Sequence, residues 1–210
     1  MSEKLTFEKL KQLANDQDLD LSTMQIKTIP VRDLAKLPRI THLDLSNNQI
    51  VEIPAEFCSK LKQLKYLDLS RNQIGFLPDN FGELSNLQKL NLHSNMIEEL
   101  PLSFSKLTKL KWLNMKDNQL DDSLTSTAAR FENCEFAAPR VVEFVKAQEA
   151  LHKKILQNQK VTLEKTDAAK KAVQDQEKAV KKKKKKAKKS GQQENLKSES
   201  EEDHANGITR

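Results

Sequence analysis

The segment HLDLSNNQI, residues 42–50, returns as YLDLSRNQI at residues 66–74. Two later copies read KLNLHSNMI at 89–97 and WLNMKDNQL at 112–120, and a degenerate copy, DLDLSTMQI, occupies 18–26. The first leucines of the five copies are 24, 24, 23 and 23 residues apart: Leu19, Leu43, Leu67, Leu90 and Leu113. A fixed period of this length indicates structural units that stack side by side along the chain.

The period and the Leu-x-Leu pattern predict an α/β fold, a leucine-rich-repeat solenoid of about five repeats shaped as a short curved horseshoe. Each repeat supplies one short strand and a return segment, and neighbours must stack because one repeat cannot bury its apolar face alone. Successive side chains of a strand point to opposite faces, so the two leucines point inward and the residue between them points outward. A broad concave sheet of this kind favours binding over catalysis.

Two further repeated features predict the scaffold. Ile53-Pro54, Leu77-Pro78 and Leu100-Pro101 are each followed three residues after the proline by a phenylalanine, which we expect to fill the space between return segments. Proline fixes its backbone dihedral and so starts each turn. One asparagine follows each of the last four strands, where its amide can satisfy backbone groups; these are Asn48, Asn72, Asn95 and Asn118.

The chain divides into five predicted segments. Residues 1–15 form an N-terminal helical cap, 16–122 the repeats, 123–138 a C-terminal cap, 139–180 an extended charged helix, and 181–210 a lysine-rich run with an acidic disordered tail. A heptad trial from Val141 places an apolar or alanine residue at seven of twelve seam positions, which is a poor seam for a coiled coil.

Charge is unevenly spread along the chain. Residues 1–139 carry 17 Lys+Arg against 19 Asp+Glu, residues 140–189 carry 17 against 6, and residues 190–210 carry 2 against 5, which sums to the net charge of +6. Two cysteines are too few for a disulfide framework, and neither a signal peptide nor an apolar run of about 20 residues is present. We therefore expect a cytoplasmic protein, with the nucleus as an alternative.

The outward positions of the strands form the first candidate site, because neighbouring strands lie about 4.8 Å apart and align these positions in columns. The chain's only Tyr and only Trp lie there, and these residue types are enriched at binding hot spots. The predicted partner-binding residues are His42, Tyr66, Lys89, Trp112, Asp44, Asp68, His93 and Lys116. The face grades from acidic in the first repeats to basic in the last. Alternatively, Leu-Asp-Leu-Ser is a common sequence in such repeats, and its Asp and Ser columns have no specific role in binding.

The second candidate site is the sequence KKKKKKAKK at residues 181–189. Its predicted phosphate-binding residues are Lys181, Lys182, Lys183, Lys184, Lys185, Lys186, Lys188 and Lys189. Such a run attracts RNA, DNA or an anionic membrane, and the attraction weakens with salt. No aromatic residue is interleaved, so base stacking is not expected; a nuclear-import signal and a solvated tail are the alternatives. Ser198 and Ser200 in SESEED are candidate phosphorylation sites whose charge would oppose the lysines.

Catalytic patterns are absent from the sequence. There is no Cys-x-x-Cys pair, phosphate-cradling glycine loop or Ser-His-Asp ordering, and His42 and His93 fall two strands apart, too far to share a metal ion. We expect no enzyme activity, no cofactor and no metal.

The segments IPVRDLAKLPRITHLDLSNNQI, FGELSNLQKLNLHSN and LKWLNMKDNQLDDSL resemble the leucine-rich repeat-containing protein 59 family, over roughly residues 15–130. That family comprises ribosome-binding proteins of the endoplasmic reticulum, which carry a charged helical region and a hydrophobic membrane anchor. The sequence to Arg210 contains no such anchor, so we do not expect membrane insertion from this resemblance.

Two functions remain open from the sequence. The resemblance implies a non-enzymatic adaptor that holds a protein partner on the concave face and touches ribosomes or RNA-rich particles through its basic segment. Peripheral contact with the anionic surface of the endoplasmic reticulum would follow from the same lysines. The alternative is an intracellular signalling scaffold of the small-GTPase type, because Leu-Pro-x-x-Phe repeats of this length also look like that group. The lysine run would then be a nuclear or membrane address.

Overall fold

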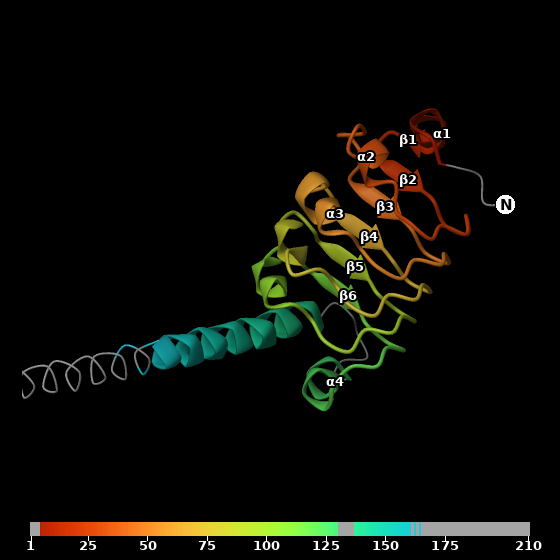
Figure 1. Ribbon diagram of the computed structural model, residues 1–210. Coiled ribbons are helices and arrows are strands. Elements are labelled where there is room, and N and C mark those ends of the chain that lie inside the picture. The colour runs from red at the N-terminus through yellow and green to blue at the C-terminus, as the bar shows by residue number, and fades with distance from the viewer. Residues whose placement is uncertain (1–4, 130–136, 161, 163, 165–210) are drawn as a thin grey trace, which may run out of the picture. The chain divides into compact units, whose positions relative to one another are not determined.

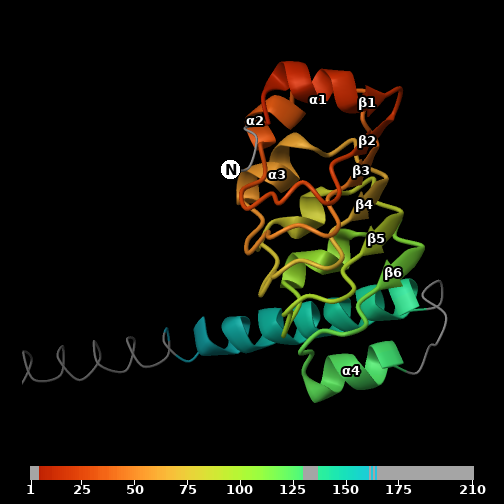
Figure 2. The ribbon, with the colours of Figure 1, turned by 90° about the vertical axis from the view of Figure 1, so that its right-hand side faces the viewer.

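A computed structural model describes residues 5–129, 137–160, 162 and 164. The chain separates into two compact units, Met1–His152 and Lys153–Arg210. The first contains the sheet and its return segments (Figures 1 and 2). The described residues of the second are helical.

Six short strands form one sheet in chain order, as Figure 1 shows for the first unit. They are β1 (Ala14–Asn15), β2 (Asp18–Asp20), β3 (His42–Asp44), β4 (Tyr66–Asp68), β5 (Lys89–Asn91) and β6 (Trp112–Asn114). β1 runs antiparallel to β2, and every later pair is parallel. The central residue of each strand from β2 to β6 is a leucine that is at most 2% exposed. The repeat period therefore sets the strand order and register, as the sequence predicts.

Short helical turns return the chain behind the sheet, as Figure 2 shows. They are α2 (Val31–Leu34), α3 (Ala55–Lys60), and the 3₁₀ turns η1 (Phe81–Glu83) and η2 (Leu102–Lys106). A proline directly precedes α2, α3 and η2, where its fixed dihedral suits the first turn. The predicted packing of the phenylalanines is confirmed, because Phe57, Phe81 and Phe104 are 0% exposed. The rings of Phe81 and Phe104 stack with centroids 6.0 Å apart.

The asparagine that follows each strand from β3 to β6 hydrogen-bonds to backbone groups of its own and the preceding repeat. Asn72 donates to the carbonyls of Leu45, Leu69 and Ser70 and accepts from the amide of Ile50. Asn48, Asn95 and Asn118 make the equivalent bonds in their own repeats. This asparagine ladder, Asn48, Asn72, Asn95 and Asn118, satisfies buried groups between neighbouring repeats, which confirms its predicted structural role.

The residue before each ladder position adopts a left-handed backbone. These residues are Asn47, Arg71, Ser94 and Asp117, and Thr23 has the equivalent position in the first repeat, before Met24; their φ values lie between 52° and 60°. None is glycine, although glycine adopts this conformation without steric cost. The turn therefore carries strain in every repeat, and the backbone bonds around the ladder hold it.

Helices also lie at the two ends of the repeat stack within the first unit. At one end α1 (Phe7–Leu13) is capped by Thr6, whose hydroxyl accepts from the amide of Lys9, and the helix buries Leu10 completely. At the other end α4 (Asp122–Ala129) buries Leu124. Residues 137–152 are helical, and Val141 and Val145 of this helix join the core.

A side-chain contact joins the helix of residues 137–152 to η2, the return segment between β5 and β6. The hydroxyl of Ser105 donates to a carboxylate oxygen of Glu149 at 2.6 Å. In the second unit residues 153–160 are helical, and the side chains of Ile155 and Leu156 are exposed. The predicted segment boundaries stay predictions. Most of the second half of the predicted charged helix, the lysine run and the acidic tail lie outside the described residues.

Candidate partner-binding face

Register brings four of the predicted residues into one column on the concave face. His42 pairs with Tyr66, Tyr66 with Lys89, and Lys89 with Trp112 across β3 to β6. Asp18 of β2 begins the same column, and its carboxylate lies 2.9 Å from Nδ1 of His42. Tyr66 and Trp112 are partly exposed and Lys89 is exposed. The column therefore offers two large aromatic surfaces on either side of a lysine.

The next column, two residues further along each strand, holds Asp20, Asp44, Asp68, Asn91 and Asn114. Each of these side chains accepts a hydrogen bond from the backbone amide two residues later, at distances of 2.8, 2.8, 2.9, 3.2 and 3.2 Å in that order. The side-chain oxygen thereby closes the turn that ends the strand, a local bond that Asp and Asn favour. One oxygen of each side chain thus belongs to the scaffold. Sequence reasoning missed this role, although the repeated Asp-x-Ser spacing contained the signal.

Asp68 differs from the other predicted binding residues because it is only 7% exposed. Its carboxylate accepts from the amide and hydroxyl of Ser70, the side chain of Asn91 and the hydroxyl of Tyr66. The sequence placed it among the outward side chains, but its donors saturate both oxygens. Its role in the structure is to position Tyr66 and the turn, and we leave it out of the binding face.

The ring of Tyr66 is fixed by this arrangement. Burial, followed by the negative charge of Asp68, raises the pKa of the Tyr66 hydroxyl above its usual value. The hydroxyl therefore stays neutral and donates to Asp68 at 3.1 Å. The ring lies 6.1 Å from the ring of His42, tilted by 47°. A fixed aromatic surface loses little conformational freedom when a partner packs against it.

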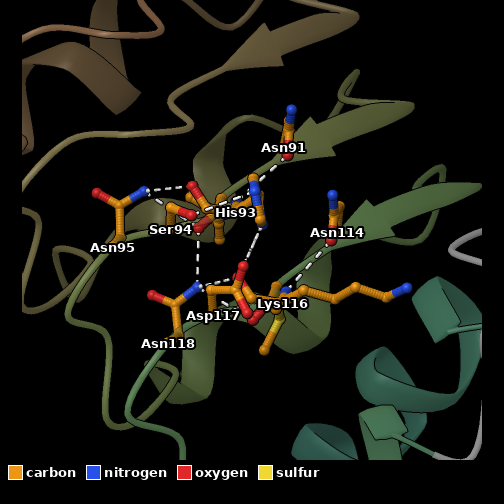
Figure 3. A network of polar contacts seen from close by, with 10 residues as sticks. Asn91, His93, Ser94, Asn95, Asn114, Lys116, Asp117 and Asn118 are labelled. Atoms are coloured by element: carbon orange, nitrogen blue, oxygen red, sulfur yellow. Dashed lines mark hydrogen bonds and ion pairs between the residues drawn. The ribbon is translucent and has the colours of Figure 1, made fainter.

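A third column lies two residues beyond the end of each strand and holds Ser22, Ser46, Ser70, His93 and Lys116. It ends in a polar network after β5 and β6 (Figure 3). Nδ1 of His93 lies 3.3 Å from the carbonyl of Lys116 and 3.4 Å from the carboxylate of Asp117. Its Nε2 lies 3.2 Å from the hydroxyl of Ser94. Figure 3 shows the ammonium group of Lys116 pointing away from these contacts. His93 is thus held by contacts with its own turn and with the turn that follows β6. Lys116, in contrast, is exposed to solvent. Of the three serines that precede them in this column, Ser46 and Ser70 are buried and Ser22 is partly exposed.

Two kinds of reactive group can be assessed in the described part of the chain: metal-holding clusters and the Cys58 thiol. No group of three or more His, Cys, Asp or Glu side chains there could hold a metal ion. Burial raises the pKa of the Cys58 thiol to about 12, so this cysteine is not a reactive thiolate. The helices that the structure describes include none that is both long and apolar enough to cross a bilayer.

Hollows lie on the surface of the described residues. One, of about 350 Å³, lies on the concave face and is lined by Asp18, Leu19, Asp20, His42, Asp44 and Tyr66. Another, of about 270 Å³, lies where η2, α4 and residues 144–148 meet. The concave hollow contains three of the predicted binding residues and is open to solvent, so it suits one side chain of a partner.

The comparisons agree with the repeat geometry. Residues 38–97 and 62–120 match the leucine rich repeat family. The matched stretch, residues 38–120, is similar to leucine-rich repeats and contains β3 to β6. Repeats of this family form concave surfaces that generally mediate protein–protein interactions, and they are typically non-enzymatic. The search of curated proteins finds no match.

Among solved structures the chain is similar to a leucine-rich-repeat protein of Leptospira interrogans, with 32% identity and a TM-score of 0.51 over 57% of this chain and 30% of that one. It is also similar to internalin C2 of Listeria monocytogenes, with 31% identity and a TM-score of 0.45 over 50% and 44% of the two chains. Internalin F of the same organism has 27% identity to this chain and a TM-score of 0.42, over 50% of this chain and 29% of that one. The chain thus spans less than half the length of each. The narrower resemblance to ribosome-binding proteins stays a prediction, because these comparisons show similarity to leucine-rich repeats in general.

Proposed function

We propose that this protein is a non-enzymatic adaptor whose concave face holds a protein partner. The observation that carries the proposal is the column of Tyr66, Lys89 and Trp112, in register on β4 to β6. The ring of neither Tyr66 nor Trp112 is buried in the core, and Lys89 is exposed. Aromatic side chains held this way are the usual anchors of a protein interface.

The double variant Tyr66→Ala/Trp112→Ala tests this face. Hot-spot aromatics each contribute at least about 2 kcal/mol, so the pair should weaken partner binding by at least about 100-fold. A photo-crosslinking residue at Lys89 should capture the same partner in the parent chain and not in the double variant. Phe76→Ala is the matched control, because Phe76 is an aromatic side chain 64% exposed and outside the strands. Equal capture by the double variant would contradict the proposal.

The second half of the proposal concerns the lysine run at 181–189, which we propose binds ribosomes or RNA-rich particles. Its support is the sequence alone: eight lysines in nine residues attract phosphate at a strength that falls with salt. In this proposal the protein works in the cytoplasm, at the cytosolic surface of the endoplasmic reticulum. Phosphorylation of Ser198 and Ser200 would weaken the contact by adding negative charge nearby.

Cosedimentation with purified ribosomes over a salt series tests the lysine run. The full chain should pellet at low salt and be released as salt rises, and replacement of all eight lysines by glutamine should abolish pelleting. Equal pelleting of both chains would show that the run is not the contact. Absence of pelleting at low salt would favour the alternative, a signalling scaffold of the small-GTPase type whose lysine run serves as a nuclear or membrane address.

A further inference from the structure

Charge on the concave face follows the order of the strands. Asp18, Asp20 and Asp44 lie on β2 and β3, whereas Lys89 lies on β5 and Lys116 lies two residues after the end of β6. Asp117, the carboxylate nearest to Lys116 in the sequence, turns toward His93 at 3.4 Å. Lys65 precedes β4, between the two ends. The face therefore has a negative end and a positive end, with Tyr66 on the strand between them.

The negative end is also where the face is hollowed. The hollow of about 350 Å³ has carboxylates at Asp18, Asp20 and Asp44, and the rings of His42 and Tyr66 form its aromatic side. Planar cations stack favourably on an aromatic ring, and more so when a carboxylate accepts their donors at the same time. A hollow with both features fits the end of an arginine or lysine side chain.

The acceptors at the hollow are only partly used by the fold. Oδ1 of Asp20 accepts from the amide of Ser22, and Oδ1 of Asp44 accepts from the amide of Ser46. Both amide bonds are to Oδ1, and Asp20 has a further hydrogen bond from the side chain of Ser22. The hydrogen bonds from Ser22 also hold the pKa of Asp20 below its usual value, so this carboxylate stays ionised. Asp68 is different, because its donors occupy both oxygens.

We propose that the partner of the concave face is a protein segment with two oppositely charged residues in fixed order. An arginine or lysine enters the hollow at Asp20, Asp44 and Tyr66, and an aspartate or glutamate meets Lys89 and Lys116. The inference rests on the proposed binding function and adds the chemistry and direction of the partner. From β3 to β6 there are three strand spacings, about 14 Å in total. An extended segment covers this distance in about four residues, and this sets the separation of the two charges.

The test uses a phage-displayed library of random twelve-residue peptides, selected against the full chain. Selected peptides should carry a basic and an acidic residue about four positions apart. A synthetic copy should bind Asp20→Asn/Asp44→Asn at least about 10-fold more weakly, and Lys89→Gln/Lys116→Gln should have a similar effect. Asparagine at these positions keeps the turn, because Asn91 and Asn114 accept the same amide bond in this chain. Asp79→Asn/Glu56→Gln removes the same charge at exposed positions outside the strands and should leave affinity unchanged.

The outcomes separate this inference from the proposed function. Peptides that need Tyr66 and Trp112, but have no charge order and ignore Asp20→Asn/Asp44→Asn, would overturn the inference and keep the binding face. Peptides with the basic residue alone would overturn the proposed contact with Lys89 and Lys116. A selection that yields no peptide sensitive to Tyr66→Ala/Trp112→Ala would overturn the binding face and this inference together.

Discussion

The asparagine ladder and the concave columns share one repeat period but differ in how their side chains are used. Every ladder position is asparagine and bonds to backbone on both sides, as Asn72 does with Leu45, Leu69 and Ile50. The first concave column changes from Asp18 through Tyr66 to Trp112 along the same stack. Uniform residues thus mark the positions that hold the repeats together, and varied residues mark the surface that is free for recognition.

The largest effect on stability should come from the ladder. Asn72→Ala removes the partner of the Ile50 amide and of three carbonyls in a buried setting. Unsatisfied buried groups are costly, so the free energy of unfolding of the repeats should fall by about 2–4 kcal/mol. Urea denaturation followed by circular dichroism measures this change. Gln73→Ala, at the exposed neighbouring position, is the control and should change it by less than about 0.5 kcal/mol. Similar changes in the free energy of unfolding for the two variants would show that the ladder asparagine contributes no more to stability than an exposed neighbour.

A second scaffold contact lies between the return segments. A Cβ atom at Gly82 would lie 1.9 Å from the carbonyl oxygen of Ser103, whereas a Cβ at Gly75 would meet nothing within 4 Å. Gly82→Ala should therefore destabilise the chain by about 1–3 kcal/mol, because η1 and η2 must separate. Gly75→Ala should leave it unchanged or stabilise it by up to about 1 kcal/mol. Parallel thermal unfolding of both variants decides this, and an equally tolerated Gly82→Ala would show that the return segments are not closely packed there.

The left-handed turns should respond in the opposite direction. Thr23 is β-branched and has φ 60°, a conformation that crowds its Cβ against the backbone. Thr23→Gly should raise the free energy of unfolding by about 1 kcal/mol, since glycine adopts this backbone freely. Thr23→Ala keeps a Cβ and should recover less of that gain. If both substitutions destabilise the chain to the same degree, the hydroxyl of Thr23 matters more than the strain.

Much of this scaffold could be predicted from the sequence, because a period of 23 or 24 residues fixes the strands and the ladder. The return phenylalanines and the register of Tyr66, Lys89 and Trp112 followed from the same repeat. The left-handed turns could not be predicted, since the residues there share no type. The contact of Ser105 with Glu149 joins residues 44 apart and follows no repeat.

The binding face was predicted less completely than the scaffold. The outward position of Asp68 follows from strand alternation, but its burial depends on Asn91 of β5 and the Tyr66 hydroxyl reaching the same oxygen. Alternation assigns a side chain to a face, whereas its exposure depends on the size and donors of side chains in the next repeat. The first column was therefore easier to predict than the second.

The smallest effect on stability should come from the concave charges themselves. Asp18 and His42 lie 2.9 Å apart, with side chains 68% and 44% exposed. Polar contacts between exposed side chains contribute little because water and salt screen them, so Asp18→Asn should change the free energy of unfolding by less than about 0.5 kcal/mol. The change should shrink further between low and high salt. Urea denaturation at two salt concentrations measures both. A loss above about 1 kcal/mol would mean that this column also holds repeats together, and the contrast between ladder and concave face would not extend to the first strands. A change within the expected limit would leave Asp18 available for the partner's cation at no cost to the fold.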